Sequence, residues 1–314
     1  MAENDAPNDR EINEARARIA PYVARTPLVR AYALQGEARA WLKLETLQPT
    51  NSFKVRPAFN SMLARLDEAR SRGVVASSSG NFAQAVAYAA RELGAHARIV
   101  MPSNTSPYKI ARTRAFAGRD DAVVLSGPTF DERWALTEKL QKESGSLLVH
   151  PYDSRETIAG DATLGLELLD DLGGDFTVVV PASGGGLLAG VALAVKTARP
   201  RARVVGVQSK ANGSMRASFV AGSRRKSPPF TSVADSLVAA IPGENTFAII
   251  KRLVDDVVDL EESEFLDAVK FLALEQKLVA EPGGAASVAA LRTGKLGRVT
   301  GDVVCIVSGG NAIS

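Results

Sequence analysis

Two loops rich in serine and glycine, each following a predicted strand, carry residue types that suit the binding of an anion. The first reads Ser-Ser-Ser-Gly-Asn-Phe over residues 77–82 and leads directly into a predicted helix. Small hydroxyls, a glycine and an amide at a helix N-terminus offer backbone N–H groups to a phosphate or a carboxylate. The same residues also form an ordinary helix cap, so this loop alone does not decide between the two interpretations.

The second loop carries three consecutive glycines between a predicted strand and a predicted helix. It reads Pro-Ala-Ser-Gly-Gly-Gly-Leu over residues 181–187. Ordering glycines costs conformational entropy, and a strand–glycine–helix unit lets the backbone approach a phosphate closely. The loop also fits the G-x-G-x-x-A pattern of dinucleotide sites, but the next predicted strand ends in Gln208 and not in an acidic residue. We therefore expect an anion site here, and the pattern disfavours an NAD(P)-dependent dehydrogenase.

A third loop and one lysine complete the candidate chemistry. Ser308-Gly309-Gly310-Asn311 follows a predicted core strand and places a hydroxyl at the carboxyl edge of a sheet, where ligands of open parallel sheets bind. Lys54 follows Phe53 and precedes an apolar helical run. A lysine is normally a surface residue. Near apolar walls, however, its pKa falls and its amine can form a Schiff base.

Short runs rich in β-branched residues alternate with Ala-rich amphipathic segments, and these elements must position the loops. Several runs, such as Thr-Val-Val-Val at 177–180, are apolar throughout, as strands covered on both faces are. The alternation predicts an α/β fold with parallel sheets. The predicted strands are Ala40–Leu44, Gly73–Ala76, Ala97–Met101, Ala122–Leu125, Leu147–His150, Phe176–Pro181, Arg203–Gln208, Val257–Leu260 and Asp302–Val307. The predicted helices include Ala83–Leu93, Thr129–Ser144, Thr163–Leu172 and one from Leu188.

Composition excludes several classes of protein. The 314 residues are 46% hydrophobic and 23% charged, which excludes a disordered chain, a collagen and a coiled coil and suggests two domains or one large one. Lys+Arg 38 minus Asp+Glu 35 leaves +3, and the one basic run, at 224–226, suits a solvated loop better than a nucleic-acid surface.

The few cysteines and histidines narrow the classes further. Cys305, the only cysteine, lies in a predicted core strand and indicates a small buried hydrophobe. The two histidines, His96 and His150, lie in separate segments, so the sequence predicts no metal site of the zinc type. The polar, acidic N-terminus and the lack of an apolar run of roughly 20 residues predict a cytoplasmic protein that binds neither a membrane nor nucleic acid.

Four motifs occur together in an order and spacing that resemble the fold-type II pyridoxal-phosphate (PLP) enzymes, and most of all the serine/threonine dehydratase (threonine ammonia-lyase) and serine racemase group. They are Ser52-Phe53-Lys54-x-Arg56, Ser78-Ser79-Gly80-Asn81, Ser183-Gly184-Gly185-Gly186-Leu187 and Ser308-Gly309-Gly310-Asn311. Segments at 25–28, 157–160, 242–244 and 281–285 extend the resemblance over nearly the whole chain. It implies the two-domain tryptophan synthase β-like fold. Residues 1–66 and 154–314 would form a large PLP-binding domain and residues 67–153 a small one, with the cofactor between them.

The resemblance also implies a role for each motif. Lys54 would hold PLP as a Schiff base and then act as the base at Cα. Asn81 would bond the 3′-oxygen of the cofactor, and Ser308 would meet its pyridine nitrogen. Ser78, Ser79, Gly80 and Asn81 would bind the substrate, with Ser79 as a possible second acid/base on the opposite face. Ser183, Gly184, Gly185, Gly186 and Leu187 would bind the phosphate.

The implied reaction is the removal of water from a small 2-amino-3-hydroxy acid, such as L-threonine, L-serine or 3-hydroxyaspartate, to give a 2-oxo acid and ammonia. The end of the chain soon after residue 311, without the regulatory domain of biosynthetic threonine deaminases, favours a catabolic enzyme. The resemblance also implies a homodimer. A racemase on the same scaffold is the main alternative; a dehydrogenase and a non-catalytic amino-acid-binding protein are more remote.

Some residues depart from the pattern of the group. Many relatives have a cation-binding glutamate where this chain has Gln208, followed by further ligands near Asn212 and Ser214. An amide and a hydroxyl are weaker ligands for a divalent ion than carboxylates, so we expect no divalent metal. Asp161 stands where relatives often have glutamine, and Tyr152 where they have phenylalanine or asparagine near the cofactor. Ser236 likewise follows Ala-Asp where relatives often have glycine.

Overall fold

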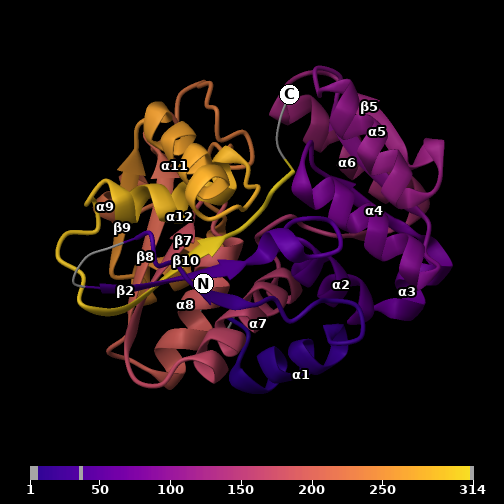
Figure 1. Ribbon diagram of the computed structural model, residues 1–314. Helices are drawn as coiled ribbons and strands as arrows, with labels where there is room; N and C mark the ends of the chain where they lie inside the picture. The colour runs from indigo at the N-terminus through magenta and orange to yellow at the C-terminus, as the bar shows by residue number, and fades with distance from the viewer. Residues whose placement is uncertain (1–5, 35–37, 312–314) are drawn as a thin grey trace.

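The computed structural model describes residues 6–34 and 38–311, which form two sheets in separate lobes (Figure 1). The larger sheet has six strands in the order β1-β2-β10-β7-β8-β9. All neighbours are parallel except β1, which is antiparallel to β2. Its strands are β1 (Leu28–Arg30), β2 (Ala38–Leu44), β10 (Gly301–Val307), β7 (Phe176–Pro181), β8 (Arg203–Ser209) and β9 (Asp256–Leu260). This arrangement confirms the predicted α/β class with mostly parallel sheets.

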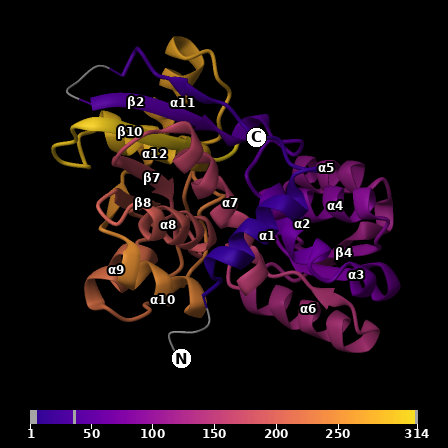
Figure 2. The same ribbon diagram turned by 90° about the horizontal axis from the view of Figure 1, so that it is seen from below.

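Helices cover both faces of the larger sheet, because its strands carry apolar side chains on both faces. On one face Val178, Val180 and Val304 pack against α1 (Asp9–Ile19), α7 (Arg155–Asp171), α8 (Gly186–Ala198) and α10 (Glu244–Leu253). On the other, Val179 and Cys305 pack against α11 (Glu262–Glu275) and α12 (Pro282–Arg292). Figure 1 shows α11 and α12 above the strands and α7 and α8 below them, and Figure 2 views the sheet from the side of α7 and α8. Cys305 is fully buried, as predicted. A further helix, α9 (Ser214–Ala221), follows β8.

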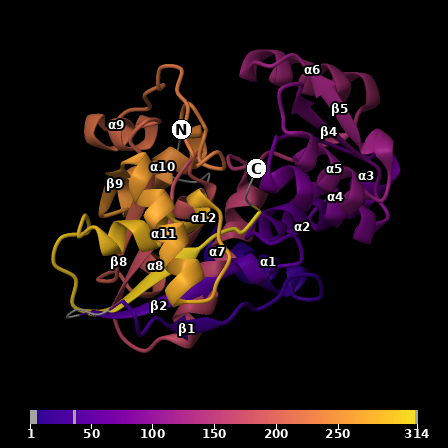
Figure 3. The same cartoon turned by 45° about the horizontal axis from the view of Figure 1, so that its top comes forward.

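The smaller sheet has four parallel strands in the order β5-β4-β3-β6. They are β3 (Val74–Ser77), β4 (Ala97–Pro102), β5 (Val123–Ser126) and β6 (Leu147–Leu148). The helices of this lobe are α3 (Leu66–Arg72), α4 (Asn81–Leu93), α5 (Pro107–Ala117) and α6 (Phe130–Ser144). Helix α2 (Val55–Leu63) packs against both α7 and α4, so it lies where the two lobes meet (Figure 3). Two short 3₁₀ turns, η1 (Glu45–Leu47) and η2 (Asp120–Ala122), complete the described elements.

Each of the nine predicted strands is present, with ends that differ by a few residues. The strand predicted at Leu147–His150 is shorter, because β6 ends at Leu148. The helix predicted from Thr163 begins earlier, at Arg155, where the Ser154 side chain caps it. The division into residues 1–66 with 154–314, and 67–153, stays a proposal. Each sheet belongs to one of these two parts, while residues 1–5, 35–37 and 312–314 lie outside the described residues.

Candidate active site

The four motifs of the sequence are brought together by contacts between segments far apart in the chain. The backbone N–H of Phe53 donates to the Ser308 carbonyl at 3.0 Å, which joins the lysine segment to the end of β10. The Asn311 amide donates to the Asn81 side-chain oxygen at 3.0 Å, which joins that end to the start of α4. The Lys54 Nζ donates to the Pro151 carbonyl at 2.9 Å, next to Tyr152, whose ring faces the glycine loop. The predicted residues therefore surround one site.

Lys54 is held between aromatic rings at the start of α2. Its Nζ lies 4.7 Å from the ring centroid of Phe53 and 5.5 Å from that of Phe82. Burial lowers the pKa of Lys54, and the negative charge of Asp161 opposes this only in part. A lowered pKa leaves more of the amine neutral, and the neutral amine is the nucleophile that forms a Schiff base. The environment of Lys54 therefore fits the role that the resemblance implies.

His150 fixes the turn that faces Lys54. Its Nδ1 accepts hydrogen bonds from the backbone N–H groups of Tyr152, at 3.3 Å, and Asp153, at 2.9 Å. Burial lowers the pKa of His150 to about 4, so the imidazole is neutral at neutral pH. A neutral ring whose Nδ1 already accepts two bonds shapes the chain from residue 150 to 153, and so orients the carbonyl that receives the lysine. No pattern in the sequence pointed to this role.

The loop after β3 leaves backbone donors open at the start of α4. Ser78, Ser79 and Gly80 are each partly exposed, and no side chain caps the helix. The Ser78 Oγ accepts from the Gly80 N–H at 3.3 Å. A Cβ built at Gly80 would meet no other atom within 4 Å, so the loop faces open space on that side. An uncapped helix N-terminus beside open space can bind a carboxylate.

The Asn81 side chain is fixed in part by Glu281, which immediately precedes α12 and whose role the sequence did not predict. The Asn81 Nδ2 donates to Oε1 of Glu281, which is buried. Burial raises the pKa of Glu281 to about 7. The amide oxygen of Asn81 is already bonded to Asn311, so both ends of this side chain are fixed. The Glu-Pro-Gly-Gly segment at 281–284 is the only sequence signal that could have pointed to this contact.

The glycine loop between β7 and α8 is closely packed against neighbouring residues. A Cβ at Gly184 would lie 2.4 Å from the Tyr152 ring, and one at Gly186 would lie 2.7 Å from Oδ2 of Asp161. Gly185 has φ +103°, a conformation that L side chains rarely adopt. No side chain caps α8, and the Ser183 Oγ accepts from the Ala239 N–H at 3.0 Å. Glycines that allow close approach at an uncapped helix N-terminus fit a phosphate.

Two further polar groups in this region escaped prediction. Among the residues that the structure describes, neither carboxylate oxygen of buried Asp161 has a hydrogen-bond partner. On the side of the smaller sheet, the buried Nε of Arg133 on α6 also has none within the described part of the chain. Burial lowers the pKa of Arg133, and Tyr152 lies close enough to oppose this shift. The sequence marked Asp161 only as a departure from the pattern of the group and gave no signal for Arg133. The surroundings of both residues depend on how separate elements pack.

Comparison with known proteins identifies the chemistry that these groups surround. A family model described as pyridoxal-phosphate dependent enzyme matches residues 19–309. The chain belongs to this family. It is 39% identical over 307 residues to the catabolic L-threonine dehydratase TdcB of Staphylococcus aureus (strain USA300), covering 96% of this chain and 88% of the relative.

Solved structures agree with the family assignment. Maize serine racemase superimposes with a TM-score of 0.94 at 36% identity, over 98% of this chain and 94% of the other. A threonine deaminase from the organism abbreviated T.th. has a TM-score of 0.91 at 39% identity, over 98% of this chain and 99% of the other. The fold-type II prediction and the cofactor prediction are confirmed: this is a PLP-dependent enzyme of the tryptophan synthase β-like fold.

The segment where relatives of the group bind a cation is held by hydrogen bonds of its own. The Gln208 Oε1 accepts from the Met215 N–H at 2.8 Å, and its Nε2 donates to the Ser214 hydroxyl at 3.3 Å. The Asn212 Nδ2 donates to the carbonyls of Leu237 and Ala239, each at 3.0 Å. Within residues 6–34 and 38–311, no cluster of three His, Cys, Asp or Glu side chains could bind a metal ion.

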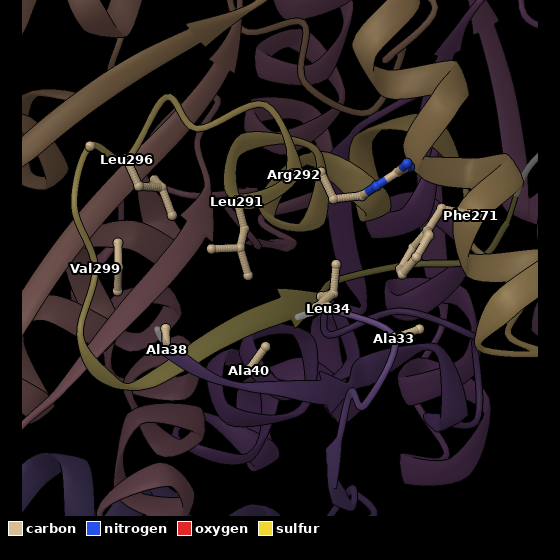
Figure 4. Close-up of a pocket in the computed structure, with 10 residues that line it drawn as sticks. Ala33, Leu34, Ala38, Ala40, Phe271, Leu291, Arg292, Leu296 and Val299 are labelled. Carbon is tan, nitrogen blue, oxygen red and sulfur yellow. The ribbon is translucent and has the colours of Figure 1, made fainter. Parts of the chain in front are cut away.

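The pocket drawn in Figure 4 lies away from this site. It has a volume of about 380 Å³ and lies between β2, α11 and the end of α12, with mostly apolar side chains such as Leu291 and Phe271 around it. None of the motif residues lines it. Among the described residues, none of the helices combines the length and the hydrophobicity needed to cross a bilayer.

Proposed function

We propose that this enzyme is a dehydratase (ammonia-lyase) that removes the β-hydroxyl of a small 2-amino-3-hydroxy acid, such as L-threonine or L-serine. The net reaction releases a 2-oxo acid and ammonia, since the water lost in elimination is regained when the resulting imine hydrolyses. The threonine dehydratase and the threonine deaminase to which the chain is similar support this reaction. When bound, PLP supplies the electron sink that cleavage of a Cα–H bond needs.

The observation that carries the proposal is the environment of Lys54. Its amine lies among the three loops, beside two aromatic rings, with a lowered pKa. Lys54 would hold the cofactor covalently and, once its amine is released, hold the proton taken from Cα at Nζ. The only nearby imidazole, His150, accepts two backbone N–H bonds at Nδ1 and is therefore poorly placed to act as that base.

The substrate would bind where the α4 N-terminus faces open space. Ser78, Ser79, Gly80 and Asn81 would bind its carboxylate through backbone N–H groups and short polar side chains. The Ser79 hydroxyl would provide an acid/base on the face opposite Lys54.

The cofactor would lie between the glycine loop and the end of β10. Ser183, Gly184, Gly185, Gly186 and Leu187 would bind its phosphate at the N-terminus of α8. Asn81 would bond its 3′-oxygen, and Ser308 would meet its pyridine nitrogen. Ser308 is buried where β10 ends, and its carbonyl bonds the residue before Lys54, which supports this arrangement. A serine hydroxyl is too weak an acid to protonate the ring nitrogen, so it favours elimination over reactions that need a longer-lived carbanion.

Two observations favour related functions. The similarity to maize serine racemase supports a racemase that uses Lys54 and Ser79 as bases on opposite faces. The unpartnered Nε of Arg133 supports an acidic substrate such as 3-hydroxyaspartate, because a second carboxylate would give this guanidinium a partner.

The test is a screen for 2-oxo acid release over L-serine, L-threonine and 3-hydroxyaspartate, with chiral analysis of the remaining amino acid. The dehydratase proposal expects 2-oxo acid as the main product, and accumulation of D-serine without pyruvate would contradict it. Borohydride reduction and peptide mapping should place the pyridoxyl group on Lys54. An adduct on another lysine would show the assignment to be wrong.

Variants of two lysines separate the catalytic role from a general loss of charge. Lys54→Ala should lower turnover by roughly 10³-fold or more and should abolish the visible absorbance of the Schiff base. Lys210→Ala is the matched control, because Lys210 is an exposed lysine paired with Glu261. The control should keep both turnover and spectrum, with unchanged far-UV circular dichroism in both variants.

We also propose a homodimer located in the cytoplasm. The single buried cysteine supports a compartment without a disulfide framework. Light scattering coupled to gel filtration measures the assembly directly, and a mass near 33.1 kDa would contradict the dimer.

A further inference from the structure

Asp161 is a buried acid that the proposed reaction does not use. It lies in the first half of α7 and has no solvent-exposed surface. Neither of its carboxylate oxygens has a hydrogen-bond partner within residues 6–34 and 38–311. Oδ2 lies against Gly186, the first residue of α8, at 2.7 Å from the place of a Cβ there. A buried polar group without a partner is costly, so this carboxyl group calls for a ligand or a proton.

The cations around Asp161 are committed to other groups. Arg56 has five N–H donors, and all five bond Glu45, Glu167 and Thr163. Lys54 donates to the Pro151 carbonyl and, in the working enzyme, would be bonded to the cofactor. No charged residue follows in the loop and helix from Ser183 until Lys196, near the far end of α8. The carboxyl group therefore faces the glycine loop without a cation of its own.

We propose that Asp161 binds the phosphate of PLP as a neutral carboxylic acid, whose O–H donates a hydrogen bond to a phosphate oxygen at the N-terminus of α8. Two anions in contact at this buried place would repel each other, whereas a neutral acid beside a phosphate gains a charge-assisted hydrogen bond. The inference rests on the proposed position of the phosphate in the glycine loop.

The charged groups that face Asp161 agree with a neutral acid. Burial raises the pKa of Asp161 to about 7, while Lys54 and Arg56 lower it and Glu45 raises it. Tyr152, whose backbone also lies against Gly186, has a raised pKa and is neutral near pH 7. A phosphate dianion would raise the pKa of Asp161 further. Because the phosphate binds the protonated form of Asp161, its affinity is greatest below the pKa of Asp161 in the cofactor-free protein. The affinity falls as pH rises through that pKa.

The experiment measures binding of pyridoxamine 5′-phosphate to the cofactor-depleted full chain between pH 6 and pH 9. This probe carries the phosphate but forms no Schiff base with Lys54. With a pKa of about 7, the wild-type dissociation constant should rise by up to about a hundredfold over this range. Asp161→Asn keeps an N–H donor but cannot titrate. The dissociation constant of the variant should lie within about threefold of the wild-type value at pH 6. Between pH 6 and pH 9 it should rise at least tenfold less than the wild-type value does.

A second measurement is independent of the folding of the variant. The infrared difference spectrum of wild-type protein with and without the probe at pH 7.5 should gain the C=O band of a protonated carboxyl group. Asp259→Asn is the matched control, since Asp259 is another acid whose pKa burial raises, but it lies on β9. That variant should keep both the band and the wild-type pH dependence.

The results distinguish a failure of the proposed role of Asp161 from a failure of the proposed phosphate position. Equal pH dependence in the wild type and Asp161→Asn overturns the role of Asp161, as does the absence of the infrared band from the wild type. A protein that binds pyridoxamine 5′-phosphate no more tightly than pyridoxamine has no phosphate site, which overturns the proposed cofactor position as well. Preference for the phosphorylated probe together with equal pH dependence overturns the role of Asp161 alone.

Discussion

Arg56, two residues after Lys54, holds together the buried charges beneath the candidate site, and its removal should cost much of the stability of the fold. Its guanidinium bonds both oxygens of Glu45 and both oxygens of Glu167, at 2.7–3.1 Å. Arg56 is 1% exposed and Glu45 0%, so water cannot replace these bonds. Arg56→Met keeps most of the volume of the side chain and removes all five donors.

The expected loss follows from which partners remain. Removal of one member of a buried ion pair costs about 3–5 kcal/mol, because the other charge is left buried. Glu167 keeps Lys43, whose Nζ lies 2.7 Å from its Oε2, while Glu45 keeps only neutral hydrogen-bond partners such as the Thr26 hydroxyl. We therefore expect Arg56→Met to lower the free energy of unfolding by about 3–5 kcal/mol. The midpoint of thermal unfolding should fall by about 10 °C.

The assay is urea unfolding of the holoenzyme followed by circular dichroism, at pH 7.5 and at pH 5. Arg56 lowers the pKa of Glu45 against the effect of burial. This stabilisation is complete above the ordinary pKa of a glutamate and is lost as pH falls through the folded-state pKa. In the variant, burial raises the pKa of Glu45 against only the Thr26 hydrogen bond and the charge of Lys43, so the folded state gains stability as the glutamate takes up a proton. The difference between the two proteins should therefore be smaller at pH 5.

The control variant is Arg39→Met, which breaks the ion pair of an exposed arginine with Asp302. The Arg39 side chain is 65% exposed, so we expect a loss of less than about 1 kcal/mol. An equally small loss for Arg56→Met, or a loss that grows between pH 7.5 and pH 5, would refute the reasoning. Either result would mean that Glu45 does not carry a charge that depends on Arg56.

Two further predictions concern the cofactor and the cation. Ser308→Asp should protonate the pyridine nitrogen of PLP and so slow elimination relative to transamination, as measured by the ratio of 2-oxo acid to pyridoxamine phosphate; an unchanged rate and ratio would show that residue 308 does not touch the ring. Chelation by EDTA should change activity by less than about twofold, because the amides of Gln208 and Asn212 donate to protein groups and offer no carboxylate to a divalent ion. A several-fold loss that magnesium or calcium restores would contradict this, and Gln208→Glu would then be the next variant to measure.

The strands were predictable because their apolar runs are local properties of the chain. Thr177–Val180 is apolar on both faces, and the structure places helices on both sides of it. β1 escaped prediction because it has only three residues, all half-buried, and is recognisable only by its pairing with β2. The first turns of α7 escaped because residues 154–157 are polar, and Gly160 and Asp161 then interrupt the apolar pattern before Thr163.

The motif residues could be predicted from their residue types, but the residues that pack around them and hold them in place could not. Gly185 and Lys54 carry their chemistry in the backbone or side chain itself, which a sequence displays. The neutral His150 and the unpartnered Asp161 depend instead on which distant segments pack against them. The Lys54 amine meets a carbonyl 97 positions away, and nothing local to either residue encodes that distance.

The last strand in chain order, β10, lies in the middle of the larger sheet, between β2 and β7. During synthesis, therefore, β2, β7, β8 and β9 all leave the ribosome before the strand that joins them. Until residues 301–307 emerge, β2 and β7 each present an unpaired edge to neighbouring chains. The smaller sheet is made entirely from residues 74–148 and can close first. The nascent protein thus passes through a stage with one finished sheet and one divided sheet, and at this stage aggregation competes most strongly with folding.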